Sequence, residues 1–314
     1  MQAAYAEALG LPDPLDGLVV GDRPPPSAPD GWEIVAVRAA TLNHHDLWTL
    51  QGVVGVRFDP PVTLGCDGAG VTADGREVVF YPVLGWGDDF RMLTDGIDGT
   101  FATHVALPSS NLLPKPEHLS FAEAAGLGTA WLTAWRMLFT KGGLREGQRV
   151  LVQGATGGVA SAAIALASAA GAHVTATSRS DAGLEHALRV GADESVPSGT
   201  RLADRVDVVI ETVGAATWSH SLRSLAYGGR VVVSGATSGS DAPADLQRVF
   251  WRELQVLGSM MGTPEEMRDL CDFVSRLGLR PEVSKAYDGI ASVPEAMRDL
   301  AAGHQLGKLA ILVD

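Results

Sequence analysis

The second half of the chain alternates short apolar strands with helices. Residues 149–153 (RVLVQ) predict a strand, 158–170 a helix, 173–177 (HVTAT) a second strand and 181–190 a second helix, and the alternation continues to residue 234. Strands that follow one another through helices and short loops form a doubly wound parallel sheet. The pattern therefore predicts an α/β fold for this half.

One stretch of this half contains no formally charged side chain, from Val150 to Ser178, and is long enough to span a bilayer. Glycines interrupt it, however, and alanine is commoner in it than leucine. This composition fits a strand, turn and helix buried in an α/β domain, where both faces of a parallel sheet are covered. We therefore expect a buried unit and no membrane span.

A glycine-rich turn joins the strand at 149–153 to the following helix. Its sequence, GATGGVA from residue 154, fits G-x-x-G-x-x-A, a variant of the dinucleotide-binding pattern. Small residues let the backbone approach a pyrophosphate, which then meets N–H groups at the positive end of the helix. A tight turn without a ligand is the alternative, but the flanking strand and helix favour a cofactor. The residues expected to bind it are Gly154, Ala155, Thr156, Gly157, Gly158 and Val159.

The end of the second strand indicates which cofactor. NAD-binding proteins usually place an acid there for the ribose 2′-hydroxyl, whereas this chain has Ser178 and Arg179 and no acid before Asp181. A hydroxyl and a guanidinium suit a 2′-phosphate, because they donate charge-assisted hydrogen bonds. These residues predict NADPH; the alternative is that Arg179 is only a solvated surface residue.

The first third of the chain predicts a smaller, mostly β domain. Residues 32–39 (WEIVAVRA), 77–80 (EVVF) and 101–107 (FATHVAL) read as strands between Pro-rich and Gly-rich connections. The first 30 residues carry six prolines and are expected to be irregular or edge-like.

The overall composition narrows the partners and the compartment. A net charge of −13 offers no basic face for nucleic acid. Two cysteines exclude a disulfide framework, and the N-terminus shows no secretory signal. We expect a cytoplasmic protein that binds a small molecule and neither nucleic acid nor membrane.

Several separated motifs resemble those of the medium-chain dehydrogenase/reductase superfamily, in its zinc-independent quinone-oxidoreductase-like branch. They are residues 40–48 (ATLNHHDLW), 64–71 (LGCDGAGV), 99–102 (GTFA), 105–108 (VALP), 124–135 (AAGLGTAWLTAW), 257–262 (LGSMMG) and 307–308 (GK), together with the glycine-rich turn.

This resemblance implies a domain order. It gives a GroES-like catalytic domain over residues 1–120, a Rossmann NADP-binding domain over 121–260 and a C-terminal return to the first domain over 261–314, with a strand at 308–313. It also implies a homodimer formed through residues 255–259.

The family includes zinc enzymes, so the ligand positions matter. By resemblance, the catalytic zinc ligands would fall at Asn43, Cys66-Asp67 and Thr129, and both Asn and Thr are poor zinc ligands. Adjacent His44 and His45 on a strand or turn would point apart. We expect no metal; a zinc site with an atypical ligand set is the alternative.

The resemblance implies that Asn43, Asp46 and Thr133 line the nicotinamide and substrate region. Asn43 would donate to a substrate carbonyl or cap a turn. Asp46 would be a scaffold acceptor rather than a proton donor. Thr133 would contact the nicotinamide or bond to its own helix, and His45 is the candidate proton relay.

The remaining expected site residues follow from the same resemblance. The cofactor would also contact Gly235, Thr237 and Lys308, and the substrate pocket would include Trp48, Val54, Tyr81 and Met260. Trp48 and Val54 stand where relatives often carry Tyr, and Gly183 stands where relatives often carry a Lys for the 2′-phosphate.

Together these features predict an NADPH-dependent, metal-free reductase that transfers hydride to a quinone or an α,β-unsaturated carbonyl acceptor. Two alternatives remain open. One is a zinc-dependent alcohol dehydrogenase with atypical ligands, and the other is a non-catalytic NADPH-binding protein.

Overall fold

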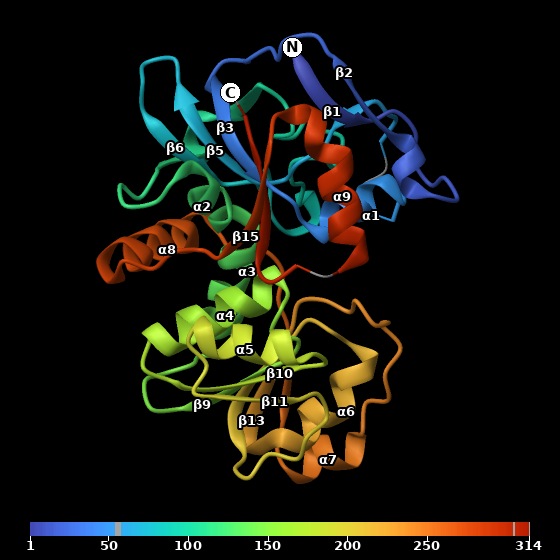
Figure 1. Ribbon diagram of the computed structural model, residues 1–314. Coiled ribbons are helices and arrows are strands. Elements are labelled where there is room, and N and C mark those ends of the chain that lie inside the picture. Colours follow the sequence, from blue (N-terminus) through green and yellow to red (C-terminus); the bar gives the residue numbers. More distant parts are fainter. Residues whose placement is uncertain (54–57, 304, 314) are drawn as a thin grey trace. The chain divides into compact units, whose positions relative to one another are not determined.

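The computed structural model describes residues 1–53, 58–303 and 305–313 and divides into two compact units (Figure 1). Unit 1 comprises Met1–Thr129 and Met267–Asp314, and unit 2 comprises Ala130–Glu266. The expected boundaries, after residues 120 and 260, lie nine and six residues before those of the units.

Unit 1 is built on the long strand β3 (Trp32–Thr41), which pairs antiparallel with β5 (Gly68–Thr72), β7 (His104–Pro108) and β16 (Lys308–Leu312). The sheet runs in the order β15-β16-β3-β5-β6-β8, with β7 beside β3. Its other strands are β6 (Glu77–Phe80), β8 (Leu112–Pro114) and β15 (Val283–Asp288). Strand β16, near the C-terminus, thus pairs with β3 of the N-terminal segment within this sheet.

The proline-rich start is more regular than expected. Strand β1 (Gln2–Ala6) pairs antiparallel with β2 (Leu18–Asp22) and with β4 (Val62–Thr63) in a second, three-stranded sheet. The prolines lie outside these strands, at residues 12–14 and 24–29. The expectation of irregular structure was therefore wrong for β1 and β2 and holds for the connections.

Short helices cover the sheets of unit 1. Val293, Met297 and Leu300 of one helix join Leu64, Phe80 and Ile311 in a buried apolar core. The helical elements are η1 (Pro14–Gly17), α1 (His44–Leu50), η2 (Gly87–Asp89), η3 (Ser109–Asn111), α2 (Phe121–Ala125), η6 (Ile290–Ser292) and α9 (Val293–Ala302). Helix α8 (Pro264–Leu277) begins in unit 2 and continues into unit 1.

Unit 2 is the predicted doubly wound parallel sheet, with strand order β11-β10-β9-β12-β13-β14. The strands are β9 (Arg149–Val152), β10 (His173–Ser178), β11 (Glu194–Pro197), β12 (Val206–Glu211), β13 (Leu225–Val233) and β14 (Gln255–Gly258). The chain runs outward from β9 to β11 and then returns to place β12 beside β9. Ligands of such sheets bind at this switch point, beyond the carboxyl ends of the strands.

The helices of unit 2 alternate with its strands, as the pattern predicted. They are α4 (Gly158–Ala169), α5 (Asp181–Arg189), α6 (Ala215–Ser224) and α7 (Leu246–Trp251). The uncharged stretch from residue 150 to 178 consists of β9, the glycine-rich turn, α4 and β10, and Val150, Ile164 and Val174 in it are fully buried. The stretch is therefore a buried unit.

The helical region from residue 121 to residue 141 is divided into four segments. Helix α2 is followed by a π-helical turn, η4 (Leu127–Trp131), then by α3 (Leu132–Trp135) and a second π-helical turn, η5 (Arg136–Lys141). Position 128 in η4 favours glycine, because a Cβ there would come within 2.7 Å of the carbonyl oxygen of Phe80.

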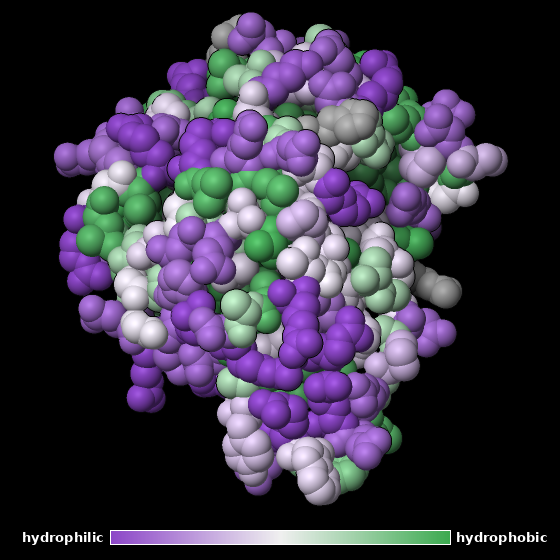
Figure 2. Space-filling model, turned by 60° about the horizontal axis from the view of Figure 1, so that its bottom comes forward, coloured by the Kyte–Doolittle hydropathy of each residue, from purple (hydrophilic) through white to green (hydrophobic). Residues whose placement is uncertain are grey.

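The helix lengths and the surface show whether the fold contains a segment that could span a membrane. No helix in the described part of the chain combines the length and apolar character needed to cross a membrane. The face seen in Figure 2 is largely hydrophilic, and its hydrophobic residues form separate small groups.

Candidate cofactor and catalytic sites

The glycine-rich turn lies at the carboxyl end of β9 and leads into α4, with Gly157 as the N-cap. Gly154 has a φ of +73°, and a Cβ there would lie 2.8 Å from a methyl carbon of Val213. The N–H groups of the first turn of α4 have no partners within the helix and can meet an anion. The turn therefore fits the pyrophosphate of a nicotinamide dinucleotide.

A buried hydrogen-bond network supports the turn from β10. Thr177 Oγ1 donates to Gln153 Oε1 over 2.7 Å and accepts from the Gly154 N–H over 3.3 Å. Gln153 Nε2 donates in turn to His220 Nδ1 and to Ser221 Oγ, over 2.9 and 3.0 Å. The strand ends on either side of the turn are thus joined by side chains.

Glu211, at the end of β12, is a fully buried carboxylate. It accepts four hydrogen bonds, from the N–H groups of Val213 and Gly214 and from the hydroxyls of Thr217 and Ser221. These bonds fix the loop after β12, which lies at the switch point of the sheet. Gln153, Thr177 and Glu211 were not predicted as site residues, although their positions at the carboxyl ends of β9 and of its two neighbouring strands are a usable signal.

The expected 2′-phosphate residues lie at the end of β10. Ser178 is buried and accepts from the Ser180 N–H over 3.3 Å, whereas Arg179 is exposed. A Cβ on Gly183 would lie 2.1 Å from Ser178 Oγ and 2.8 Å from Thr156 Cγ2. A side chain such as the lysine of relatives therefore does not fit at Gly183 without moving Ser178.

Gly235 and Thr237, also expected at the cofactor, lie in the loop after β13 beside the loop after β12. A Cβ on Gly235 would lie 2.9 Å from the carbonyl oxygen of Thr212, and Thr237 Oγ1 donates to the same oxygen over 3.5 Å. Both residues thus lie at the carboxyl ends of the central strands.

Thr133 and Met260 also belong to unit 2. The Thr133 hydroxyl donates to Met261 Sδ over 3.3 Å, so its bond leads to the loop after β14 and not to its own helix. Met261 is buried, whereas Met260 is about half exposed. Of the two methionines, Met260 is the one accessible to a ligand.

Unit 1 contains a buried polar cluster around Asp67, which is fully buried. Its carboxylate accepts from the N–H and the hydroxyl of Thr41, over 3.2 and 2.7 Å, and from Asn43 Nδ2 over 3.0 Å. Asn43 Nδ2 also donates to the carbonyl of Thr41 over 3.3 Å. Both amide hydrogens of Asn43 are engaged, so the expected bond to a substrate carbonyl has no amide hydrogen left.

Lys308 completes this cluster and lies in unit 1, on β16. Its ammonium donates to Asn43 Oδ1 over 2.6 Å and to the carbonyl of Leu42 over 2.8 Å, and it lies 3.7 Å from Asp67 Oδ2. The side chain is 4% exposed. The contacts of Lys308 are therefore with the motif around Asn43 and with Asp67, whereas Lys308 was expected to contact the cofactor.

Two titratable side chains lie next to the cluster. Asp46 accepts from the N–H groups of Asn43 and Gly65, over 2.8 and 3.0 Å, which matches the acceptor role expected of it. Burial raises the pKa of Asp46 to about 6. Burial, followed by the charges of Asp46 and Asp67, raises the pKa of the Cys66 thiol well above its usual value, and this thiol contacts Thr129 Oγ1 at 3.6 Å.

His44 and His45 begin helix α1, not a strand or a simple turn as expected, because Asn43 and Asp46 form a capping box there. His45 Nε2 lies 3.2 Å from Asp95 Oδ1. Desolvation, together with the Lys308 ammonium, lowers the pKa of His44. The ring centroids of His44 and Trp48 lie 6.3 Å apart, and the two ring planes are inclined at 46°.

The expected substrate-pocket residues differ in exposure. Trp48 is 39% exposed, whereas Tyr81 is buried at 3% and is therefore less accessible than expected. Val54 lies outside the described residues.

The residues present do not fit a catalytic zinc ion. Within residues 1–53, 58–303 and 305–313, no three His, Cys, Asp or Glu side chains are grouped to hold a metal. At the positions that resemble zinc ligands, the amide of Asn43 and the carboxylate of Asp67 surround a buried ammonium, which would repel a divalent cation.

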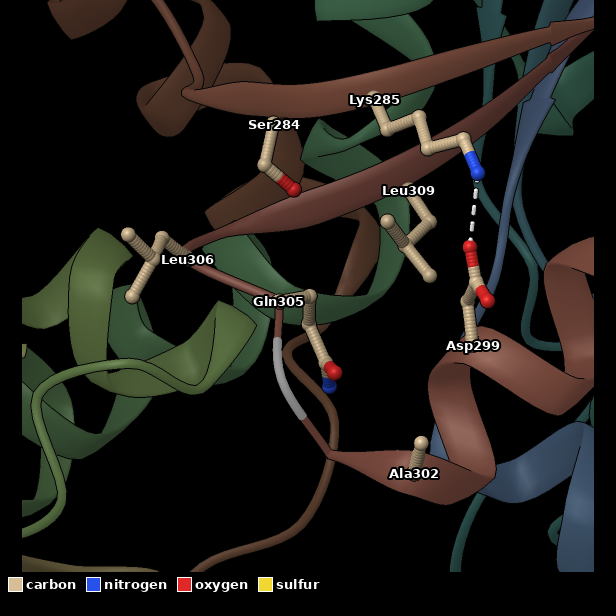
Figure 3. A pocket seen from close by; sticks show the side chains of 7 residues that line it. All are labelled: Ser284, Lys285, Asp299, Ala302, Gln305, Leu306 and Leu309. Carbon is tan, nitrogen blue, oxygen red and sulfur yellow. Dashed lines mark hydrogen bonds and ion pairs between the residues drawn. The ribbon is translucent and has the colours of Figure 1, made fainter.

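A cavity of about 350 Å³ also lies in unit 1 (Figure 3). In it Lys285 Nζ donates to Asp299 over 2.8 Å. The lining residues are Ser284, Lys285, Asp299, Ala302, Gln305, Leu306 and Leu309.

Comparison with known proteins agrees with this architecture. Residues 29–117 match the alcohol dehydrogenase GroES-like domain, and residues 158–276 match the zinc-binding dehydrogenase family. A solved structure of an NAD-dependent alcohol dehydrogenase superposes with a TM-score of 0.94 at 34% identity, and the match covers 100% of both chains.

Two curated proteins are similar over most of their length. The zinc-type alcohol dehydrogenase-like protein C1773.06c of Schizosaccharomyces pombe is 30% identical over 322 residues, which cover 90% of this chain and 91% of that protein. The mitochondrial NAD(P)H oxidoreductase RTN4IP1 of Homo sapiens is 28% identical over 330 residues, which cover 89% and 81%. With its GroES-like and Rossmann domains, the chain belongs to the medium-chain dehydrogenase/reductase superfamily of nicotinamide-dependent oxidoreductases.

Proposed function

We propose that the chain is an NADPH-dependent, metal-free reductase that transfers hydride to a quinone or an α,β-unsaturated carbonyl. The observation that carries the proposal is the position of Lys308 in the buried cluster of unit 1. A buried ammonium bonded to Asn43 and 3.7 Å from Asp67 stands where related zinc enzymes would need a cation-binding site. Polarisation of the acceptor by a metal is therefore not part of the proposed chemistry.

The preference for NADPH is supported by the end of β10. Exposed Arg179 follows buried Ser178, and the first acid is Asp181, the first residue of α5. A 2′-phosphate at this place would meet a guanidinium and a hydroxyl and no adjacent carboxylate from the end of β10. NADH carries a neutral 2′-hydroxyl there and would form no ion pair with Arg179.

Bound NADPH would supply the hydride, and the residues of the chain would bind, orient and handle protons. The backbone of the glycine-rich turn would hold the pyrophosphate. Asn43, with both amide hydrogens engaged, would position Lys308 and Asp67 in place of donating to the carbonyl. Trp48, which is partly exposed, would give an apolar wall that suits a flat conjugated acceptor.

His45 remains the proposed proton relay. The Asp95 carboxylate, 3.2 Å from Nε2, would hold the ring in place, and Nδ1 would exchange a proton with the reduced acceptor.

A panel of enones, enoyl thioesters and quinones, each tested with NADPH and NADH, measures the proposed activity. We expect NADPH oxidation by at least one class, unchanged after treatment with a zinc chelator. One tightly bound zinc per chain, with activity lost on chelation, would favour the alcohol dehydrogenase alternative. Tight NADPH binding without turnover of any acceptor would favour a non-catalytic binding protein.

Arg179→Ala tests the assignment of the 2′-phosphate. Loss of a hydrogen bond to a charged group costs about 1.5–3 kcal/mol, so the Kd for NADPH should rise roughly tenfold to a hundredfold while the Kd for NADH changes little. Arg201, also exposed in unit 2, supplies the control variant Arg201→Ala. An equal loss for both cofactors would show that Arg179 does not contact the 2′-phosphate.

We also propose a homodimer that forms through β14. This strand is an edge of the six-stranded sheet, and Phe250, Trp251 and Val256 beside and within it are exposed. Pairing of two such edges would satisfy their backbone groups and cover the apolar side chains. Light scattering measures the oligomeric state directly, and a monomer at micromolar concentration would contradict the proposed homodimer.

A further inference from the structure

A series of hydrogen-bonded side chains leads from exposed Arg189 on α5, through buried His186 and Ser161, to the glycine-rich turn. Arg189 Nη2 lies 3.0 Å from His186 Nδ1, and a guanidinium can only donate. His186 Nδ1 therefore accepts, and the proton of the neutral ring is on Nε2. That nitrogen lies 2.8 Å from Ser161 Oγ and donates to it. His186 is fully buried and Ser161 nearly so.

This series of hydrogen bonds ends on the backbone of the glycine-rich turn. Because Ser161 Oγ accepts from His186, its own hydrogen is available for the carbonyl of Ala155, 3.1 Å away. The Ala155 N–H donates to the carbonyl of Thr177 over 2.8 Å. Ala155 is thus fixed at both its N–H and its carbonyl.

The direction of the Ala155 carbonyl determines that of the next N–H. In a trans peptide, the carbonyl and the following N–H point in opposite directions. Since the carbonyl of Ala155 points toward buried Ser161, the Thr156 N–H points away from it. No hydrogen bond joins the Thr156 N–H to another described residue, so this donor is left for a ligand beside the N-terminus of α4.

We propose that His186 and Ser161 are positioning residues that aim the Thr156 N–H at the pyrophosphate of the cofactor. The inference rests on the proposed cofactor site. It assigns a role to two residues that touch no cofactor themselves and act through the peptide between Ala155 and Thr156. Arg189 sets the tautomer of His186, and this tautomer determines the direction of the hydrogen bonds that run from His186 through Ser161 to Ala155.

Ser161→Ala tests the inference, and Ser224→Ala is a matched control. Ser161 and Ser224 are both 6% exposed, and each hydroxyl donates to a backbone carbonyl, that of Ser224 to His220 over 2.9 Å. We expect the Kd for NADPH to rise about tenfold in Ser161→Ala, the order for a weakened hydrogen bond to a charged group, and less than twofold in Ser224→Ala.

A fragment of the cofactor separates positioning from general damage. Adenosine 2′-monophosphate carries no pyrophosphate, so its Kd should stay within twofold of wild type in Ser161→Ala. In the protein without ligand, amide hydrogen exchange of residues 155–157 should be faster in Ser161→Ala than in Ser224→Ala, because the peptide has lost its anchor.

A pair of variants at His186 supplies a rescue test. The amide of His186→Gln can donate to Ser161 and accept from Arg189, so NADPH affinity should stay close to wild type. His186→Leu keeps the volume without either bond, and its Kd for NADPH should resemble that of Ser161→Ala.

Different results would contradict the positioning role and the cofactor site itself. Equal affinity of wild type and Ser161→Ala for NADPH, or an equal loss for NADPH and adenosine 2′-monophosphate, would overturn the positioning role alone. Failure of the wild-type protein to bind either NADPH or NADH would overturn the cofactor site and the inference with it.

Discussion

Each unit buries a carboxylate completely, and the two are stabilised in different ways. Asp67 in unit 1 is bonded to Thr41 and Asn43 and has the ammonium of Lys308 at 3.7 Å. Glu211 in unit 2 is bonded to two backbone N–H groups and two hydroxyls that follow it by 2 to 10 residues along the chain. No cation of the described residues forms an ion pair with Glu211.

The difference shows two solutions to the same problem. A buried carboxylate needs either a counter-charge or several hydrogen bonds to replace water. Unit 1 takes its counter-charge from far along the chain, since Lys308 lies 241 residues after Asp67. Unit 2 uses only local, neutral donors, so its carboxylate should tolerate the loss of one partner better.

Removal of the distant cation should have the largest effect. Lys308→Met leaves Asp67 without its counter-charge, and loss of one partner of a buried ion pair costs about 3–5 kcal/mol. The free energy of unfolding from urea denaturation measures this loss. Lys285, whose side chain is 46% exposed and paired with Asp299, gives the control Lys285→Met, with an expected loss below about 1 kcal/mol. Equal losses of unfolding free energy in the two variants would show that Lys308 does not stabilise the fold as a buried counter-charge of Asp67.

A pH series at Asp46 should show the next largest effect. Asp46 has two backbone donors, and burial raises its pKa to about 6. The folded state therefore holds a proton that the unfolded state releases near pH 4. The stability due to the protonated carboxyl is present below about pH 4 and is lost as the pH rises through about 6.

Asp46→Asn removes this titration. The stability of wild type relative to Asp46→Asn should therefore fall by up to about 3 kcal/mol between pH 4 and pH 7, at 1.36 kcal/mol per pKa unit. Urea denaturation of both proteins over this range measures the difference. A difference that stays constant with pH would show that the pKa of Asp46 is not raised.

Loss of one local donor in unit 2 should have the smallest effect. Thr217→Val removes one hydroxyl from Glu211 and leaves two N–H groups and Ser221, so we expect a loss of about 1–2 kcal/mol. Thr63, whose hydroxyl is buried without a hydrogen-bond partner in the described structure, gives the control Thr63→Val, which should not lose stability. A loss in Thr217→Val as large as that in Lys308→Met would remove the contrast between the units.

The sequence predicted the local features of unit 2 well. Alternation of strands and helices is encoded in short segments, and the glycine-rich turn needs small residues wherever it occurs. The start of the chain was harder, because its prolines suggested irregular structure, whereas β1 forms before them and β2 forms between two groups of them. The π-helical turns η4 and η5 leave no simple pattern in the sequence.

The site was predicted less completely, because its contacts join distant segments. The motif containing Asn43 and the residue Lys308 were both recognised, but their contact depends on the pairing of β16 with β3. The engagement of both Asn43 amide hydrogens likewise depends on Asp67, which lies on another part of the fold. Residue type indicates what a side chain can bond, whereas the tertiary pairing decides what it does bond.

The position of β16 has a consequence for synthesis of the protein. Unit 2 is one continuous segment, Ala130–Glu266, whereas unit 1 needs residues from both ends of the chain. A ribosome that has made the first 300 residues has released every strand of unit 2, but β3 still lacks β16 along residues 39–41 and Asp67 still lacks its ammonium. We therefore expect unit 2 to become resistant to protease on the ribosome first, and unit 1 to depend on chaperones until residue 312 has emerged.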